Sequence, residues 1–192
     1  MEAAEARELI EDAIERTEAA GEREKAAEHA FRNRVSVLVG VFALLLAVVH
    51  TAAAGAARDS LLSAIEGSDT YAYMQAKTVR ETVLIANANM PGLDRDVRAS
   101  EMGEAMRLRG PDHNGHGIVQ LQERGAELRK ESRAAAIRSE GYEMAETALQ
   151  LAIVLLSIAL IAQSRPIVWG ASSLAGAGIL LAVLTALGVS LI

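Results

Sequence analysis

The run VSVLVGVFALLLAVVHTAAAGAA, residues 35–57, decides the fold, because its 23 residues include no Asp, Glu, Lys or Arg. An α-helix rises about 1.5 Å per residue, so the run extends about 35 Å and is long enough to cross a hydrocarbon core of about 30 Å. A secretory signal is the alternative, but a long acidic segment precedes the run instead of a short basic one. We therefore expect a transmembrane helix.

This helix is expected to continue past the apolar run, since no proline occurs before Pro91 and apolar residues keep spacings of three and four. We call this heptad pattern the aliphatic stripe; it comprises Leu62, Ile65, Asp69, Ala72, Ala76, Val79, Val83, Ala86 and Met90. In the same phase the pattern extends back through Gly55, Thr51, Val48, Leu44, Val41 and Val37. The sequence predicts one continuous helix with a coiled-coil seam, whose weak point, for a kink or a short break, is Gly67-Ser68-Asp69.

A second heptad pattern follows a loop, and we call it the return seam. It comprises Ile118, Leu121, Gly125, Leu128, Ser132, Ala135, Ser139, Tyr142, Glu146 and Leu149. Many of its members are small, so we expect the return seam to pack closely on the aliphatic stripe as an antiparallel hairpin. Pro91 ends the first arm, and Leu93–Arg109 is compatible with a short helix in the tip.

The chain is therefore predicted to be an all-α integral membrane protein, with three transmembrane helices and a long antiparallel helical-hairpin or coiled-coil arm outside the membrane. The predicted segments are a polar amphipathic helix at 1–34 interrupted at Gly21, transmembrane helix 1 at 35–57, the extramembrane hairpin at 58–147 with its tip at 91–117, transmembrane helix 2 at 148–164 and transmembrane helix 3 at 167–190.

Composition agrees with this class of protein. Hydrophobic residues make up 51% of the chain and the mean hydropathy is +0.20, while aromatic residues are only 3%, which favours close helix-on-helix packing. The net charge of −6 and the absence of a basic segment give nucleic-acid binding no electrostatic support. The absence of cysteine excludes disulfides and thiol catalysis.

Small residues recur at a spacing of four in the third predicted span, as Ser172 with Gly176 and Gly178 with Ala182. This spacing lets helix backbones approach closely in lipid. Two explanations stay open: packing against the other two spans, and self-association in an oligomer.

Residues with potential chemistry are few. Asp112, His113 and His116 are weak candidate metal ligands: a turn rich in Asp, Asn and His is the favoured explanation, and they match no standard zinc spacing. His50 and Gln150 are polar residues within or near the spans; they fit a structural hydrogen bond to each other or the lining of a pore. No nucleotide-binding loop, nucleophile elbow or paired-His motif occurs, so we expect no enzyme and no cofactor.

The positive-inside rule sets the expected orientation. Five basic residues flank the spans on one side, namely Arg23, Lys25, Arg32, Arg34 and Arg165. Three flank the other side, namely Arg58, Arg133 and Arg138. The amino terminus is therefore expected in the cytoplasm, with residues 58–147 on the opposite side; Phe31 and Trp169 are aromatic residues on the inner face.

The segment from Ser68 to Arg80, with Tyr71 and Tyr73 followed by Gln75-Ala76-Lys77-x-x-Arg80, resembles a family of bacterial membrane proteins catalogued as domain of unknown function 4337. The resemblance includes the polar amino terminus and two closing spans around a Ser-Arg turn, here Ser164-Arg165. It implies this architecture and a bacterial inner membrane location. It implies no activity.

Three hypotheses for function follow. The first is a non-enzymatic, homo-oligomeric inner-membrane scaffold that presents its helical arm to lipids or protein partners. The second is an oligomeric ion channel or transport component, with His50 or the third spans lining the path. The third is a metal-binding or sensing module at the hairpin tip.

Overall fold

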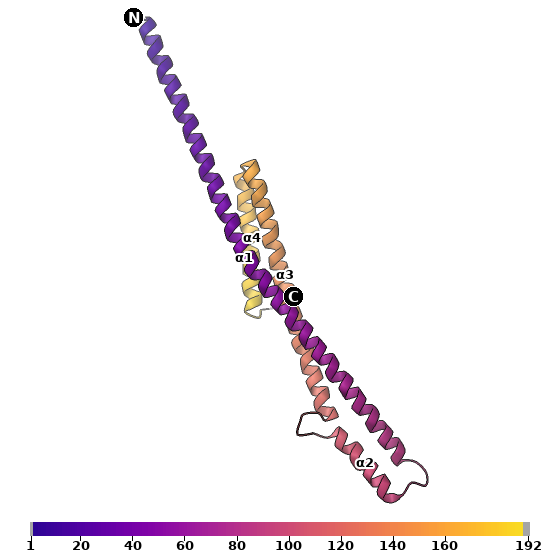
Figure 1. The fold of residues 1–192 in the computed structure, drawn as a ribbon. Helices are drawn as coiled ribbons and strands as arrows, with labels where there is room; N and C mark the ends of the chain where they lie inside the picture. The colour runs from indigo at the N-terminus through magenta and orange to yellow at the C-terminus, as the bar shows by residue number, and fades with distance from the viewer. Residues whose placement is uncertain (1, 190–192) are drawn as a thin grey trace. The chain divides into compact units, whose positions relative to one another are not determined.

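The computed structural model describes the backbone of residues 2–189, and the side chains of residues 21–189 except residue 24. Four helices follow one another: α1 (Glu2–Ala88), α2 (Arg95–Arg109), α3 (Ile118–Ala162) and α4 (Arg165–Ala186) (Figure 1). Within this described part of the chain there is no strand. The short helix expected in the tip is confirmed as α2.

Helix α1 is continuous through Gly21 and Gly67, so the interruption predicted at Gly21 is wrong, and α1 has no break at Gly67. A helical glycine costs only about 1 kcal/mol relative to alanine, and strong helix formers such as Ala and Glu surround Gly21 and directly precede Gly67. The helix ends at Ala88, shortly before Pro91, as expected. The polar helix predicted at 1–34 is helical in its backbone from residue 2, but most of its side chains lie outside the described residues. Residue 190, the last residue of the predicted third span, lies outside them as well.

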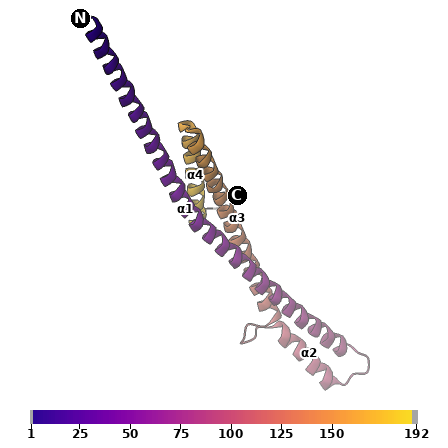
Figure 2. The same ribbon diagram turned by 45° about the horizontal axis from the view of Figure 1, so that its top comes forward.

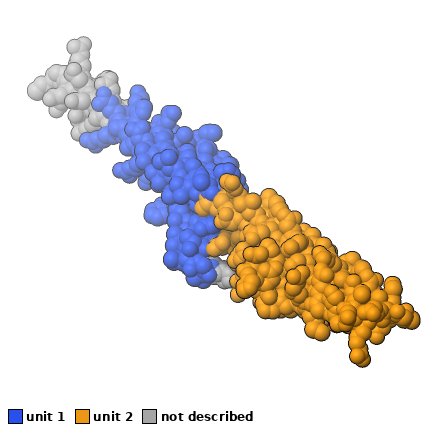
Figure 3. Space-filling view, turned by 60° about the horizontal axis from the view of Figure 1, so that its bottom comes forward, with its two compact units in different colours: residues 1–51, 141–189 blue, residues 52–140, 190–192 orange. Residues whose placement is uncertain are grey.

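The chain divides into two compact units, which Figure 3 shows in different colours. Unit 1 comprises residues 1–51 and 141–189, and unit 2 is built from residues 52–140. Among the described residues, three helices are long and apolar enough to cross a membrane: α1 from Gly21, α3 and α4. These are the three helices for which the sequence predicts spans.

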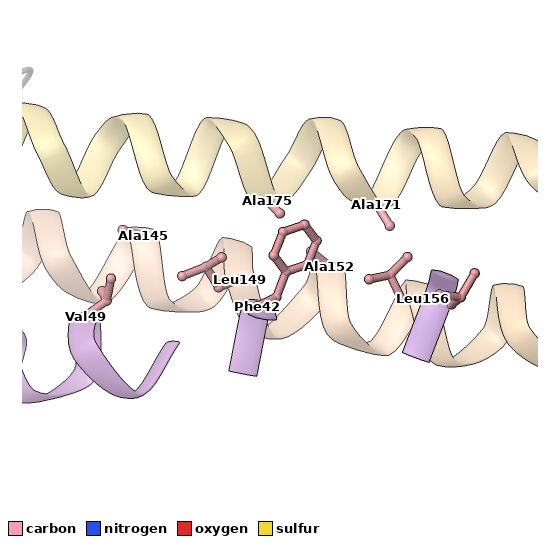
Figure 4. Packing of buried hydrophobic residues seen from close by; sticks show 9 residues of the cluster. Phe42, Val49, Ala145, Leu149, Ala152, Leu156, Ala171 and Ala175 are labelled. Atoms are coloured by element: carbon pink, nitrogen blue, oxygen red, sulfur yellow. The ribbon is translucent and has the colours of Figure 1, made fainter. Parts of the chain in front are cut away.

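The core of unit 1 is formed where α1, α3 and α4 pack together. Its buried residues are Val35, Phe42 and Val49 from α1, Ala145, Leu149, Ala152 and Leu156 from α3, and Ala171 and Ala175 from α4. The three α1 residues are seven apart and therefore share one helix face. In the close-up of Figure 4, the Phe42 ring lies beside Ala152 and Ala175. Small residues on α3 and α4 thus leave room for one bulky ring from α1.

The glycines of α4 occupy different surroundings. A Cβ atom at Gly178 would lie 3.0 Å from the Ala148 Cβ and 3.1 Å from the Ala145 carbonyl oxygen, whereas a Cβ at Gly176 would meet nothing within 4 Å. Gly178 is buried, Ser172 and Ala182 are half-buried, and Gly176 is exposed. Of the two predicted small-residue pairs, Gly178 with Ala182 therefore packs inside unit 1, while Gly176 points outward.

Gly178→Leu should therefore destabilise unit 1, whereas Gly176→Leu should not. The added side chain at Gly178 has to push α4 away from the α3 backbone, which costs about 1–3 kcal/mol, as overpacking usually does. Thermal loss of helicity, followed by circular dichroism in detergent, measures the difference. Equal midpoints for the two variants would contradict the placement of Gly178.

Unit 2 is an antiparallel pair made by α1 and α3, with α2 beside it at the tip (Figures 1 and 2). The Ser132 hydroxyl donates to the Ser60 carbonyl oxygen at 3.0 Å, and the Ser139 hydroxyl donates to the Ala53 carbonyl oxygen at 3.5 Å. Ile118, Leu121, Gly125, Leu128, Ala135 and Ser139 are buried and Ser132 is half-buried. The return seam is therefore confirmed as the inward face of α3 in this unit.

The partner of the return seam is not the aliphatic stripe, and this part of the prediction is wrong. The α1 face that packs inward comprises Ala53, Ala56, Ser60, Ser63, Gly67, Thr70, Met74, Lys77, Glu81, Leu84 and Ala88, all buried or half-buried. These residues also keep spacings of three and four, two positions out of phase with the stripe, which places them on the other side of the helix. Small residues on both helices allow a close backbone approach that Leu62 or Ile65 would prevent.

Candidate interaction surface

The aliphatic stripe of unit 2 faces outward from the α1/α3 pair. The exposed fractions are 53% for Leu62, 49% for Ile65, 64% for Val79 and 51% for Val83. The alanines of the stripe, Ala72, Ala76 and Ala86, are exposed as well, as is Asp69. Single exposed apolar residues are ordinary on protein surfaces, but a continuous row is typical of an interaction site.

A groove of about 520 Å³ borders the stripe and shares Ala72 with it. The groove lies between α1 and α3, and its polar lining includes Ser68, Gln75, Arg129 and Arg133. The Arg129 guanidinium lies 4.4 Å from the centre of the Tyr71 ring, within the range of a cation–π contact. One edge of the stripe is therefore polar and basic.

Ion pairs link α1 to α3 and to α2 along one flank of the stripe. Arg124 of α3 donates to a Glu66 carboxylate oxygen at 3.0 Å, and this hydrogen bond raises the pKa of the Arg124 guanidinium above its ordinary value. Arg80 donates to a Glu104 carboxylate oxygen of α2 at 2.5 Å.

Glu81 is a charged residue that lies on the inward face of α1. It is 5% exposed and accepts from the Arg109 Nε at 2.8 Å. A buried carboxylate needs such a partner, because an unpaired charge away from water is costly. Arg109 is the last residue of α2, so this pair fixes the end of α2 against α1.

Lys77 of α1 binds a backbone carbonyl group of the loop that follows α2. The Lys77 ammonium donates to the His116 carbonyl oxygen at 2.5 Å and lies 5.3 Å from the centre of the Tyr73 ring. The His116 ring contacts the Tyr73 ring edge-on, with centroids 5.6 Å apart. Together these contacts of Lys77 and Tyr73 with His116 attach the loop to α1.

The three candidate metal ligands are spread over this loop. One Asp112 carboxylate oxygen accepts from the Asn114 backbone N–H at 2.6 Å, which is the bond of an Asx turn, and His116 packs on Tyr73. Across the residues that the structure describes, no three His, Cys, Asp or Glu side chains gather closely enough to hold one metal ion. The local contacts of Asp112 and His116 are those of a turn.

In unit 1, His50 and Gln150 do not bond to each other directly. A carboxylate that the sequence analysis assigned only to the return seam lies between them: Glu146 accepts from the His50 Nδ1 at 3.2 Å and from the Gln150 amide at 3.0 Å. The His50 side chain is 67% exposed and that of Glu146 is 19% exposed. These two hydrogen bonds connect α1 to α3. In the sequence, the spacing of four residues between Glu146 and Gln150 could have indicated that these two side chains interact on one helix face.

Comparison with known proteins adds a family but no activity. No curated protein and no solved structure matches the chain. The sequence profile of the family described as "Domain of unknown function (DUF4337)" matches residues 31–188, which include all of α2, α3 and α4. The chain therefore belongs to the DUF4337 family.

Proposed function

We propose that this protein is a non-enzymatic, homo-oligomeric scaffold of the bacterial inner membrane, in which copies of the chain associate along the aliphatic stripe. The observation that carries the proposal is the exposure of the stripe in unit 2, with Leu62, Ile65, Val79 and Val83 each about half exposed or more. Full burial of one such side chain contributes about 1.5–3 kcal/mol, so leaving the row in water is unfavourable. A partner that covers it gains this free energy.

The membrane part of the proposal is supported by three helices of sufficient length and hydropathy. In the proposed arrangement, the amino terminus lies in the cytoplasm and residues 58–147 stand in the periplasm, because basic residues flank the spans more densely on the amino-terminal side. Lipid then covers the exposed apolar residues of unit 1, such as Leu44 and Val48. The stripe beyond residue 58 has no lipid around it and needs another cover.

A second copy of the chain suits the stripe because copies in one membrane share an orientation and meet in parallel. In heptad notation, Leu62, Asp69, Ala76 and Val83 fall at one core position, and Ile65, Ala72 and Val79 at the other. Asp69 of one copy then faces Asp69 of the next. A polar residue at a core position fixes register and oligomer number at some cost in stability, so Asp69 has a role in this arrangement.

Residues beside the stripe do not oppose self-association. The flanking positions of a parallel pair hold Leu61, Glu66, Ser68, Tyr73, Gln75, Arg80, Thr82 and Asn87. Only Glu66 and Arg80 among them are charged, and each is already paired within its own chain. At these flanking positions no two like charges face each other across such a pair; the like-charge contact of the arrangement is Asp69 with Asp69 at the core, which is part of the cost in stability named above.

Native mass spectrometry of the full chain, released from mild detergent, tests the proposal directly. The expected result is one defined oligomer that persists on dilution. A strict monomer at every protein concentration would rule the scaffold out.

A further inference from the structure

A second cavity, of about 500 Å³, lies in unit 1 between α1 and the beginning of α4. Two arginines from distant parts of the chain meet there: Arg34 on α1, and Arg165, the first residue of α4. Each directly precedes an uncharged run, residues 35–57 in one case and 166–192 in the other. The cavity therefore combines cationic groups with the first turns of two apolar helices.

Neither arginine has a carboxylate partner among the described side chains, whereas Arg80, Arg109 and Arg124 of the arm are all paired. The nearby acid Glu28 accepts a hydrogen bond from the Gln163 amide instead. The amino-terminal end of α4 adds the positive end of its helix dipole beside Arg165. Among the described residues, the lining of the cavity therefore includes two guanidiniums and no carboxylate.

The remainder of the cavity wall is apolar. Val35 is buried at 1% exposure, Leu38 and Val168 are half-buried, and Phe31 lies on the same side. Trp169 borders the cavity with 79% of its surface exposed. An exposed tryptophan beside arginines, at the edge of an apolar helix, is typical of the membrane–water interface.

We propose that this cavity binds an anionic phospholipid, with its phosphate between Arg34 and Arg165 and an acyl chain along Leu38, Val168 and Trp169. A free phosphate would use the guanidiniums but would leave the apolar half of the cavity unused; an amphiphile uses both. The lining includes no carboxylate to receive the amine of a zwitterionic headgroup, which favours a headgroup with net negative charge. Basic pockets between membrane helices on the cytoplasmic side bind anionic lipids in this way. The inference rests on the proposed membrane placement.

The full chain, purified in mild detergent, should retain phosphatidylglycerol over phosphatidylcholine of the same acyl chains when both are titrated and bound lipid is counted by native mass spectrometry. The variant with R34Q and R165Q together should bind phosphatidylglycerol about 30-fold more weakly, and each single variant about fivefold more weakly. R58Q is the matched control: Arg58 directly follows the same uncharged run and is not among the residues that line the cavity, so this variant should bind as the unaltered protein does. Circular dichroism verifies that all variants are equally helical.

Equal retention of the two lipids, or undiminished phosphatidylglycerol binding by the double variant, would overturn the inference. So would displacement of the lipid by glycerol 3-phosphate at matched concentration, because that result marks a site for small phosphates. The same spectra report the oligomer, which separates the two proposals. A monomer that selects phosphatidylglycerol contradicts only the scaffold, and an oligomer without lipid selectivity contradicts only the lipid site.

Discussion

Replacing Ile65, Val79 and Val83 together by glutamine should convert the oligomer into monomers while leaving each chain folded. These side chains are exposed by 49%, 64% and 51%, and none belongs to the inward face of α1, so the substitutions leave the buried contacts of the α1/α3 pair in place. In a two-chain contact, six apolar side chains are lost, at about 1 kcal/mol each for the half of their surface that association buries. The sum, about 6 kcal/mol, weakens association by a factor on the order of 10⁴.

The control for this variant places glutamine at Val97, Met106 and Val119. These residues are 47%, 67% and 48% exposed in the same unit, but they lie on α2 and α3, off the stripe. Their variant should keep the oligomer mass of the unaltered chain. If the stripe variant also keeps that mass in native mass spectrometry, the stripe is not the surface through which copies meet.

The second large effect is expected inside the hairpin, where Leu128→Ala should destabilise unit 2 by about 2–5 kcal/mol. Leu128 is 1% exposed and its Cβ lies 3.4 Å from the position that a Cβ on Gly67 would take, so it fills the space above that glycine. Removing it leaves a cavity that the two helices cannot close without moving. Chemical unfolding followed by circular dichroism measures the loss.

Leu62→Ala is the matched comparison, because Leu62 belongs to the outward stripe and is 53% exposed. Both substitutions are made in the monomeric triple-glutamine variant, so that association does not contribute to the measured stability. Leu62→Ala should then cost less than about 0.5 kcal/mol, as surface substitutions usually do. A larger loss from Leu62→Ala than from Leu128→Ala would mean that the two faces of α1 have been assigned the wrong way round.

Helix type, helix order and most boundaries could be predicted from the sequence, because long uncharged runs and proline-glycine breaks act locally. The run at 35–57 and the break at Pro91 each depend on neighbouring residues alone. The return seam could also be found, since Leu121 and Leu128 mark a clear apolar face on α3. Each of these features is a property of one segment.

The pairing of faces could not be predicted in the same way. Helix α1 carries two heptad patterns on opposite sides, and the aliphatic one has the stronger hydrophobic signal. The structure instead packs the face of Ser60, Gly67 and Ala88 inward, because small residues on α1 and α3 let the backbones approach. Hydrophobic periodicity identifies a face that needs covering, but it does not say which surface covers it.

Contacts between distant segments were missed for a related reason. Arg34 and Arg165 entered the sequence analysis only as charges that set orientation, and nothing in their local sequence indicates that they line one cavity. Glu146 was assigned to a heptad position, and its role as the acceptor between His50 and Gln150 depends on the register between α1 and α3. Register of this kind is a tertiary property.

Single-cysteine scanning of α1, in membranes that contain the full chain, tests the central claim most directly, because the sequence has no cysteine to interfere. A disulfide between copies requires Cβ atoms about 3.5–4.5 Å apart. We expect oxidation to cross-link copies through cysteine at Ile65, Ala72 or Val79, but not through cysteine at Ser63 or Thr70 on the inward face. Cross-linking at Ser63 and Thr70 with none along the stripe would contradict the account.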